Sequence, residues 1–128
     1  EALVLRTIAV AVISLSVLGS TFVLAHHGGS MYPNREDESI LEDAVVGEFL
    51  FVNPHARLLF SWTDADGTAS EWEGELSGST ELVRSGVYAN LLGTGDRITV
   101  KGYLHSSIPR NLRLSSVVLP DGREVPLP

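Results

Sequence analysis

A run of nineteen uncharged residues, Thr7 to Ala25, is the feature that most limits what this chain can form. Arg6 precedes the run, and His26 and His27 follow it directly. A helix that crosses a membrane needs about 20 apolar residues, whereas the apolar part of a signal peptide has about 7–15. The length therefore predicts a transmembrane anchor over residues 1–25, or a signal-like segment that is not cleaved.

A second interpretation of the same run stays open. Val23 and Ala25 place small residues at the third-last and last positions of a leader, as a signal peptidase requires. Cleavage after Ala25 would leave His26 at the N-terminus, with a free α-amine and an imidazole that can both bind a metal. The state of the Ala25–His26 bond decides between an anchor and a chelating N-terminus.

The charges on either side of the run predict its orientation. Arg6 lies before it, and the acidic residues Glu36-Asp37-Glu38 lie after it. The positive-inside rule then places the N-terminus in the cytoplasm and the rest of the chain in the periplasm, with a single pass through a bacterial inner membrane. Within the run, small residues are the expected points of close approach for another helix: Ser16, Gly19 and Ser20.

The rest of the chain is acidic and has the size of one domain. About a hundred residues follow the run, which is enough for one modest core. Glu1 and Arg6 cancel, so these residues carry all of the net charge of −7. Such a domain repels phosphates, and nucleic acid is therefore not an expected partner. Cysteine is absent, which excludes disulfides and zinc–thiolate sites.

The pattern of residues predicts an acidic linker over residues 26–43 and a β-domain over residues 44–128. The segment 44–52 is rich in strand formers, with a bulge or bend expected at Gly47, and Asn53-Pro54 ends it. Further strands are expected in four segments of alternating or strand-forming residues: 56–62, 70–76, 97–103 and 111–119. A short final segment follows the turn at Asp121-Gly122-Arg123.

A short helix is expected between the third and fourth strands. Ser79 and Thr80 are placed to cap a helix over residues 81–84, and Gly86 is placed to end it. Three strands, a helix and two or three more strands is the order of an OB-like or SH3-like barrel. The predicted fold is therefore mainly β, a small barrel of five to six strands with one short helix, preceded by a single N-terminal transmembrane helix.

The third predicted strand carries alternating glutamates and a tryptophan. Trp72 is expected to point inward, whereas Glu71, Glu73 and Glu75 lie on the opposite face. Three carboxylates on one face should be solvated or should face basic groups.

Two motifs carry a resemblance to a known family. The apolar leader ends in Ala25-His26-His27, and Asn53-Pro54-His55-Ala56 follows the first strand. With these motifs, the chain resembles a family of small bacterial exported or periplasmic domains of unknown function. Because the family has no established activity, the resemblance implies a location and a fold and assigns no catalytic residue. The family usually has serine after the paired histidines, where this chain has Gly28. Weaker matches lie at Trp72, Leu82, Arg84, Gly86, Gly95-Asp96 and Asp121-Gly122-Arg123.

The histidines are the candidate metal ligands. Neutral imidazole is the commonest ligand for copper and zinc. In a chain that begins at His26, the α-amine and Nδ1 close a chelate, and His55 adds a third nitrogen, a set that favours Cu(II). His27 is a spare ligand, and His105 is a weaker candidate. The alternative is structural: the pair is an interfacial linker, and His55 satisfies a turn.

No sequence motif indicates an enzyme. Gly93-Thr94-Gly95 lacks the lysine of a phosphate-binding loop, and the alternating glutamates are typical of an exposed strand. We therefore predict a non-catalytic accessory or structural subunit of a larger membrane complex, of the respiratory or photosynthetic kind. Its partners would be membrane protein subunits, bound through the N-terminal helix and the periplasmic domain. The alternative is a soluble periplasmic copper-binding or copper-delivery protein.

Overall fold

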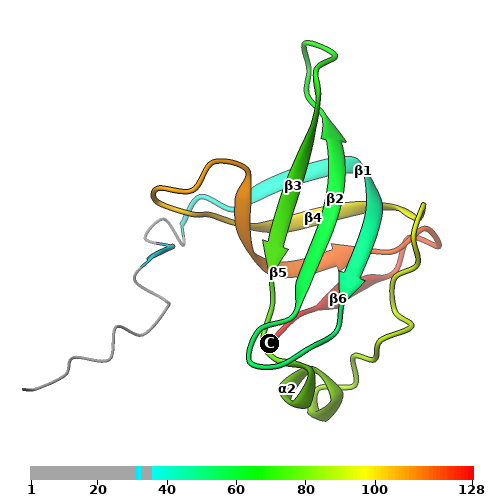
Figure 1. The fold of residues 1–128 in the computed structure, drawn as a ribbon. Coiled ribbons are helices and arrows are strands. Elements are labelled where there is room, and N and C mark those ends of the chain that lie inside the picture. The colour runs from blue at the N-terminus through cyan, green and yellow to red at the C-terminus, as the bar shows by residue number, and fades with distance from the viewer. Residues whose placement is uncertain (1–30, 33–35) are drawn as a thin grey trace, which may run out of the picture.

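Strands dominate the structure, a computed structural model that describes residues 31–32 and 36–128 (Figure 1). One short helix, α2 (Ser79–Arg84), lies between the third and fourth strands. The strands are β1 (Ser39–Leu50), β2 (Arg57–Thr63), β3 (Ala69–Glu75), β4 (Arg97–Leu104), β5 (Asn111–Val118) and β6 (Glu124–Pro126).

The strands form one sheet in the order β3-β2-β1-β4-β5-β6, in which neighbouring strands are antiparallel. A parallel pairing of β3 with β5 joins the two sides and closes the first five strands into a barrel. The mainly-β barrel predicted from the sequence is thus confirmed, with β6 as an extra strand. The predicted transmembrane helix lies outside the described residues, and within them no helix is long and apolar enough to cross a membrane.

Strand β1 curves because it pairs with two different neighbours, β2 and β4 (Figure 1). Its register against β2 shifts between Val46 and Glu48, which confirms the bulge expected at Gly47. A second irregularity lies between Leu41 and Ala44. These irregularities let one long strand bend around the barrel.

The first strand begins at Ser39, five residues before the start expected at residue 44. The expectation that the acidic segment up to Asp43 is a linker is therefore wrong for its last part. Leu41 is only 6% exposed and contributes to the core, while Glu42 and Asp43, at the irregularity between Leu41 and Ala44, remain exposed. The first part of β1 has one buried residue among carboxylates, so its composition alone is typical of a solvated linker.

Alternate strand residues fill the inside of the barrel. The largest fully buried strand side chains are those of six residues: Val46, Leu58, Phe60, Val100, Leu112 and Val117. Helix α2 lies at the end of the barrel opposite the β2–β3 turn, and its Leu82 is fully buried in the same core (Figure 1). Trp62 and Trp72 meet edge to face at a centroid distance of 5.8 Å and pack on this core.

Candidate functional site

The corner between β1 and β2, which carries Asn53-Pro54-His55-Ala56, packs against the start of α2. Asn53 Oδ1 accepts a hydrogen bond from the Thr80 backbone N–H at 3.2 Å, and its Nδ2 donates to Thr80 Oγ1 at 3.0 Å. The helix begins at Ser79, and its N-cap residue is Gly78, which has no side chain that could cap the helix. The expected capping by Ser79 and Thr80 is therefore wrong, because Asn53 supplies the acceptor from a distant part of the chain.

The corner is held at both of its ends. Ala56 is fully buried, donates its N–H to Ser77 O at 3.2 Å and accepts from Leu76 N at 2.9 Å. At the other end, a Cβ on Gly78 would lie 2.5 Å from Asn53 Oδ1 and from Pro54 O. The corner therefore fixes the backbone of His55 beside the end of β3.

His55 forms an ion pair with Glu75, the last residue of β3. Its Nδ1 lies 3.2 Å from Glu75 Oε1, and the two side chains are 56% and 31% exposed. A carboxylate only accepts hydrogen bonds, so the pairing places a proton on Nδ1. In the neutral ring the lone pair then lies on Nε2. This is the arrangement in which metal-binding histidines are commonly oriented by a carboxylate.

Tyr32 binds the other oxygen of the same carboxylate. Its hydroxyl lies 3.2 Å from Glu75 Oε2 and 2.9 Å from Asn111 Oδ1, and the residue is 5% exposed. Burial raises the pKa of Tyr32 to about 12, and the negative charge of Glu75 adds to this effect. Its ring meets the edge of His105 at a centroid distance of 5.1 Å. The segment that precedes β1 is thus attached to the barrel at Glu75.

The parallel pairing of β3 with β5 places basic groups beside the glutamates. Glu75 pairs in register with Arg113, whose Nη1 lies 4.0 Å from Glu75 Oε1. On the other side of β3, its antiparallel neighbour β2 brings Arg57 Nη1 to 3.9 Å from Glu73 Oε1. Of the two expectations for this face, the structure thus supports carboxylates that face basic groups. We name the set Tyr32, His55, Glu75, Asn111 and Arg113 the Glu75 cluster.

His105 has a structural role in the β4–β5 loop. Its Nδ1 accepts hydrogen bonds from the backbone N–H groups of Ser107 and Ile108, each at 3.0 Å. A nitrogen that accepts two hydrogen bonds carries no proton, so the proton of the neutral ring is on Nε2. This tautomer leaves no free lone pair for a metal ion, which makes His105 a poorer candidate ligand than His55.

The other predicted site residues lie outside the described part of the chain. These are the candidate metal ligands His26 and His27 and the helix-packing residues Ser16, Gly19 and Ser20. Residues 31–32 and 36–128 alone contain no group of three or more histidine, aspartate or glutamate side chains arranged to hold a metal ion. Of the three predicted metal ligands, the structure therefore places His55.

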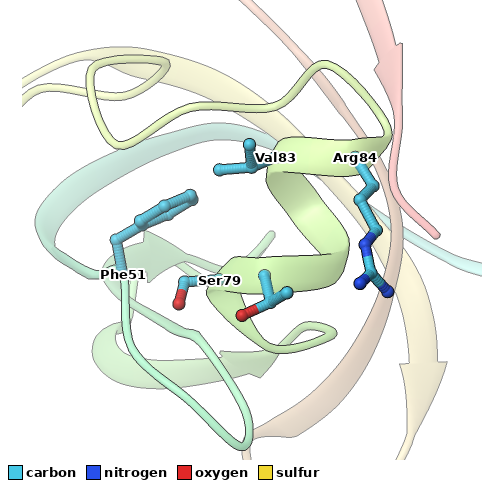
Figure 2. Close-up of a pocket in the computed structure, with 5 residues that line it drawn as sticks. Phe51, Ser79, Val83 and Arg84 are labelled. Carbon is cyan, nitrogen blue, oxygen red and sulfur yellow. The ribbon is translucent and has the colours of Figure 1, made fainter.

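A shallow hollow lies beside α2, away from the Glu75 cluster. Phe51 and Val83 face each other across it, and Ser79 lies near Phe51, while the guanidinium of Arg84 points away (Figure 2). Thr80 also lines the hollow. The hollow measures about 430 Å³ and is open to solvent. Its lining offers an apolar contact surface and hydroxyl groups, without a carboxylate or an imidazole.

Sequence reasoning missed three members of the Glu75 cluster. The sequence pattern places Arg113 in a strand but gives it no partner, because the alternation of apolar and polar residues does not tell which strands pair. Asn111 was treated as the first residue of that strand, although it is buried and accepts from Tyr32. Tyr32 falls within the segment 26–43, for which the sequence pattern predicts only an acidic linker. A large aromatic residue in a polar segment was the available signal, since such a side chain usually packs on something.

Comparisons with known proteins give one family and one solved structure. A family model described as "Family of unknown function (DUF6152)" matches residues 12–110. The mitochondrial single-stranded DNA-binding protein Rim1 of S. cerevisiae has 9% sequence identity and a TM-score of 0.49, covering 66% of this chain and 93% of that one. Among curated proteins, none matches the chain significantly.

Proposed function

This chain belongs to the DUF6152 family of unknown function, and we propose that it is a non-catalytic accessory subunit of a bacterial membrane protein complex. Residues 1–25 anchor it in the inner membrane, and the barrel faces the periplasm. The observation that supports this role best is the filled barrel, because a module whose interior is packed acts through its surface.

The core supports a binding role for the outside of the molecule. Side chains such as Phe60 and Val100 are fully buried and occupy the space in which a ligand-binding barrel would hold its ligand. The hollow beside α2 is open rather than enclosed. We propose that the barrel is OB-like rather than SH3-like, on the basis that β1 pairs with both β2 and β4 while β3 and β5 close the sheet.

The attachment of Tyr32 to the barrel also supports an anchored subunit. A free linker would let the domain move away from the membrane, whereas Tyr32 binds the barrel only seven residues after Ala25. Seven residues span at most about 25 Å. The barrel therefore stays close to the end of the apolar run, where it can touch the exposed loops of neighbouring subunits.

Purification in a mild detergent tests the proposal. The untagged protein, extracted from its own membrane, is expected to migrate with larger membrane subunits on a sizing column. Replacing Ser16, Gly19 and Ser20 by leucine should release it from them, while leucine at Ala2, outside the run, should not. A protein that always migrates alone, as a water-soluble species without residues 1–25, would contradict the proposal.

Copper binding is the second candidate function, and the His55–Glu75 pair is the observation that favours it. The carboxylate pairs with Nδ1 of an exposed ring and so leaves the lone pair of the neutral ring on Nε2, which suits a metal ligand more than a turn residue. His26 and His27 would supply further nitrogens, through imidazoles alone in the anchored form or with the α-amine after cleavage at Ala25. The absence of cysteine is consistent with a nitrogen site.

Titration of the purified protein with Cu(II) tests this candidate. The expected result is one bound ion, with a weaker affinity in His55→Gln. His105→Gln is the matched control, since that ring already uses its Nδ1 within a loop. Equal affinities in the wild type and His55→Gln would exclude His55 as a ligand.

A further inference from the structure

We infer that the loop between β4 and β5 is a membrane-contact surface, at which Met31, Leu104 and Ile108 enter the headgroup region of the bilayer. The inference rests on the proposed anchoring of the chain, and it adds the face that the barrel turns toward the lipid. We name these three residues, together with the loop residues 105–110, the loop patch.

Exposed apolar side chains gather around this loop. Seven large apolar side chains are exposed in the described part of the chain, and three belong to the loop patch: Met31 at 50%, Leu104 at 46% and Ile108 at 52%. Met31 is attached to the loop because its carbonyl accepts from Ser106 N at 2.8 Å. The loop, orange in Figure 1, projects from the barrel on the same side as residues 31–32. Large exposed apolar patches commonly mark a surface that binds a protein or a membrane.

The charge of the loop and its two strands differs from that of the whole chain. Between Asp96 and Asp121 the sequence has no acidic residue, although the chain has 16 of them and a net charge of −7. The same stretch carries four of the nine lysine and arginine residues. Strands β4 and β5 with their loop are therefore the part of this acidic domain that anionic headgroups repel least.

The backbone N–H groups of the loop are bonded within the protein. His105 Nδ1 accepts two of them at 3.0 Å, and the carbonyl oxygens of Met31 and Asn111 accept two others at 2.8 and 2.9 Å. The donors are consecutive, and a proline without an N–H follows them: His105, Ser106, Ser107, Ile108 and Pro109. Because an unpaired polar group is costly to take out of water, a loop with bonded donors enters the bilayer interface more easily than an open one.

The position of Met31 in the chain brings the loop patch within reach of the bilayer. Met31 follows Ala25, the end of the apolar run, by six residues, which span at most about 22 Å. Its hydrogen bond to Ser106 then keeps the loop close to the place where the run leaves the membrane. The other exposed apolar residues have no such link to the run.

Acidic side chains limit the depth of the contact. Glu71 and Glu73 of β3 line a shallow hollow together with Ile108, and carboxylates are costly to bring into lipid. Only the tip of the loop therefore enters the interface. Arg110 donates from Nε to Glu71 O at 3.2 Å, which places a guanidinium at the base of the loop, where it can bind a lipid phosphate.

Spin labelling of the full chain tests the inference, since a protein without cysteine can carry a nitroxide at one introduced cysteine. The chain is reconstituted in phosphatidylcholine vesicles with the label at Ser107→Cys in the loop, or at Ala65→Cys in the exposed β2–β3 turn. Power saturation measures how often the label meets oxygen, which concentrates in lipid, and a water-soluble nickel chelate. The label at residue 107 is expected to give a higher oxygen-to-nickel ratio than the label at residue 65.

Replacement of the apolar side chains separates lipid contact from mere proximity. With the label at residue 107, Leu104→Ser combined with Ile108→Ser should lower the oxygen-to-nickel ratio toward the value at residue 65. Val52→Ser combined with Val83→Ser is the matched control, because these residues are similarly exposed, at 46% and 44%, but lie at α2 and the corner before β2. The control should leave the ratio unchanged.

Flotation of the Leu104→Ser, Ile108→Ser variant with vesicles in strong salt tests the anchor separately, because that variant keeps the apolar run. If it floats while the label at residue 107 resembles that at residue 65 in the unsubstituted loop, the inference is overturned, the anchor stands, and the loop patch faces a protein. A ratio that the two serines leave unchanged also overturns the inference. If the protein stays in the aqueous fraction, both the inference and the anchor fail.

Discussion

Tyr32 and His55 bind opposite oxygens of one carboxylate, that of Glu75. Tyr32 comes from the segment before the barrel, and His55 comes from the corner between β1 and β2. The pairing of β3 with β5 brings Asn111 and Arg113 to the same place. This polar junction is therefore also the point at which the barrel binds Tyr32, in the segment before β1.

Removal of the Tyr32 hydroxyl should destabilise the barrel. In Tyr32→Phe, the buried Asn111 Oδ1 loses the hydrogen bond measured at 2.9 Å, and a buried acceptor without a partner costs about 1–3 kcal/mol. Urea unfolding should show this loss, while Tyr88→Phe should change the free energy of unfolding by less than about 0.5 kcal/mol. Equal urea midpoints for Tyr32→Phe and Tyr88→Phe would mean that the Tyr32 hydroxyl contributes nothing to the stability of the barrel.

Stability should also decrease in strong alkali because of Tyr32. Its pKa is raised to about 12 in the folded protein, against about 10 in an unfolded chain. The contribution to stability is fully present below about pH 10 and is lost as the pH rises through about 12. The absorbance of tyrosinate should report an ionisation at about pH 12 that belongs to Tyr32. Tyr32→Phe should lack that ionisation, and a variant that keeps it would contradict the assignment.

Asn53 should stabilise α2 although it lies outside the helix. Asn53→Ala removes the acceptor of the Thr80 N–H and should cost about 1 kcal/mol, as for other N-terminal caps. Asn53→Asp retains an acceptor oxygen and should recover most of the loss. The measurement is the urea midpoint of the three proteins. If Asn53→Asp is as unstable as Asn53→Ala, the hydrogen bond from Asn53 Nδ2 to Thr80 Oγ1 stabilises the helix more than the bond that Asn53 Oδ1 accepts.

Gly78 should tolerate no side chain. A Cβ at this position lies 2.5 Å from Pro54 O, a backbone atom that cannot rotate away, so Gly78→Ala must displace the corner that holds His55. Such overpacking typically costs about 1–3 kcal/mol. Gly93→Ala is the matched control, because its Cβ would meet Asp96 at 3.6 Å, an ordinary contact. Thermal unfolding of both variants checks the prediction, which fails if Gly78→Ala melts with the wild type.

The barrel could be predicted because its strands follow local rules. Gly47 indicated the bulge in β1, and residues 97–103 alternated cleanly in β4. Asn53-Pro54 indicated the end of β1, which lies two residues before the expected Val52, at Leu50. The start of β1 was missed because Leu41 is one buried residue among acidic ones. The cap of α2 was missed because Asn53 reaches it from 27 positions away, and sequence patterns report neighbours better than distant contacts.

The Glu75 cluster was only partly predictable. His55 was singled out by its chemistry and the alternating glutamates by their spacing, but the partners of Glu75 depend on the parallel pairing of β3 with β5. No local pattern reports that pairing, since it joins strands that are far apart in the sequence. Tyr32 likewise falls within the predicted linker, and its burial depends on Glu75 and Asn111, which only the folded barrel brings together.

Intact-mass spectrometry of the protein isolated from its own membrane tests the central claim most directly. An anchored accessory subunit predicts a mass that includes the apolar run Thr7–Ala25, in a particle that also contains larger membrane proteins. A mass that begins at His26, in a protein that leaves the membrane fraction with salt alone, would contradict that account and favour the soluble copper protein.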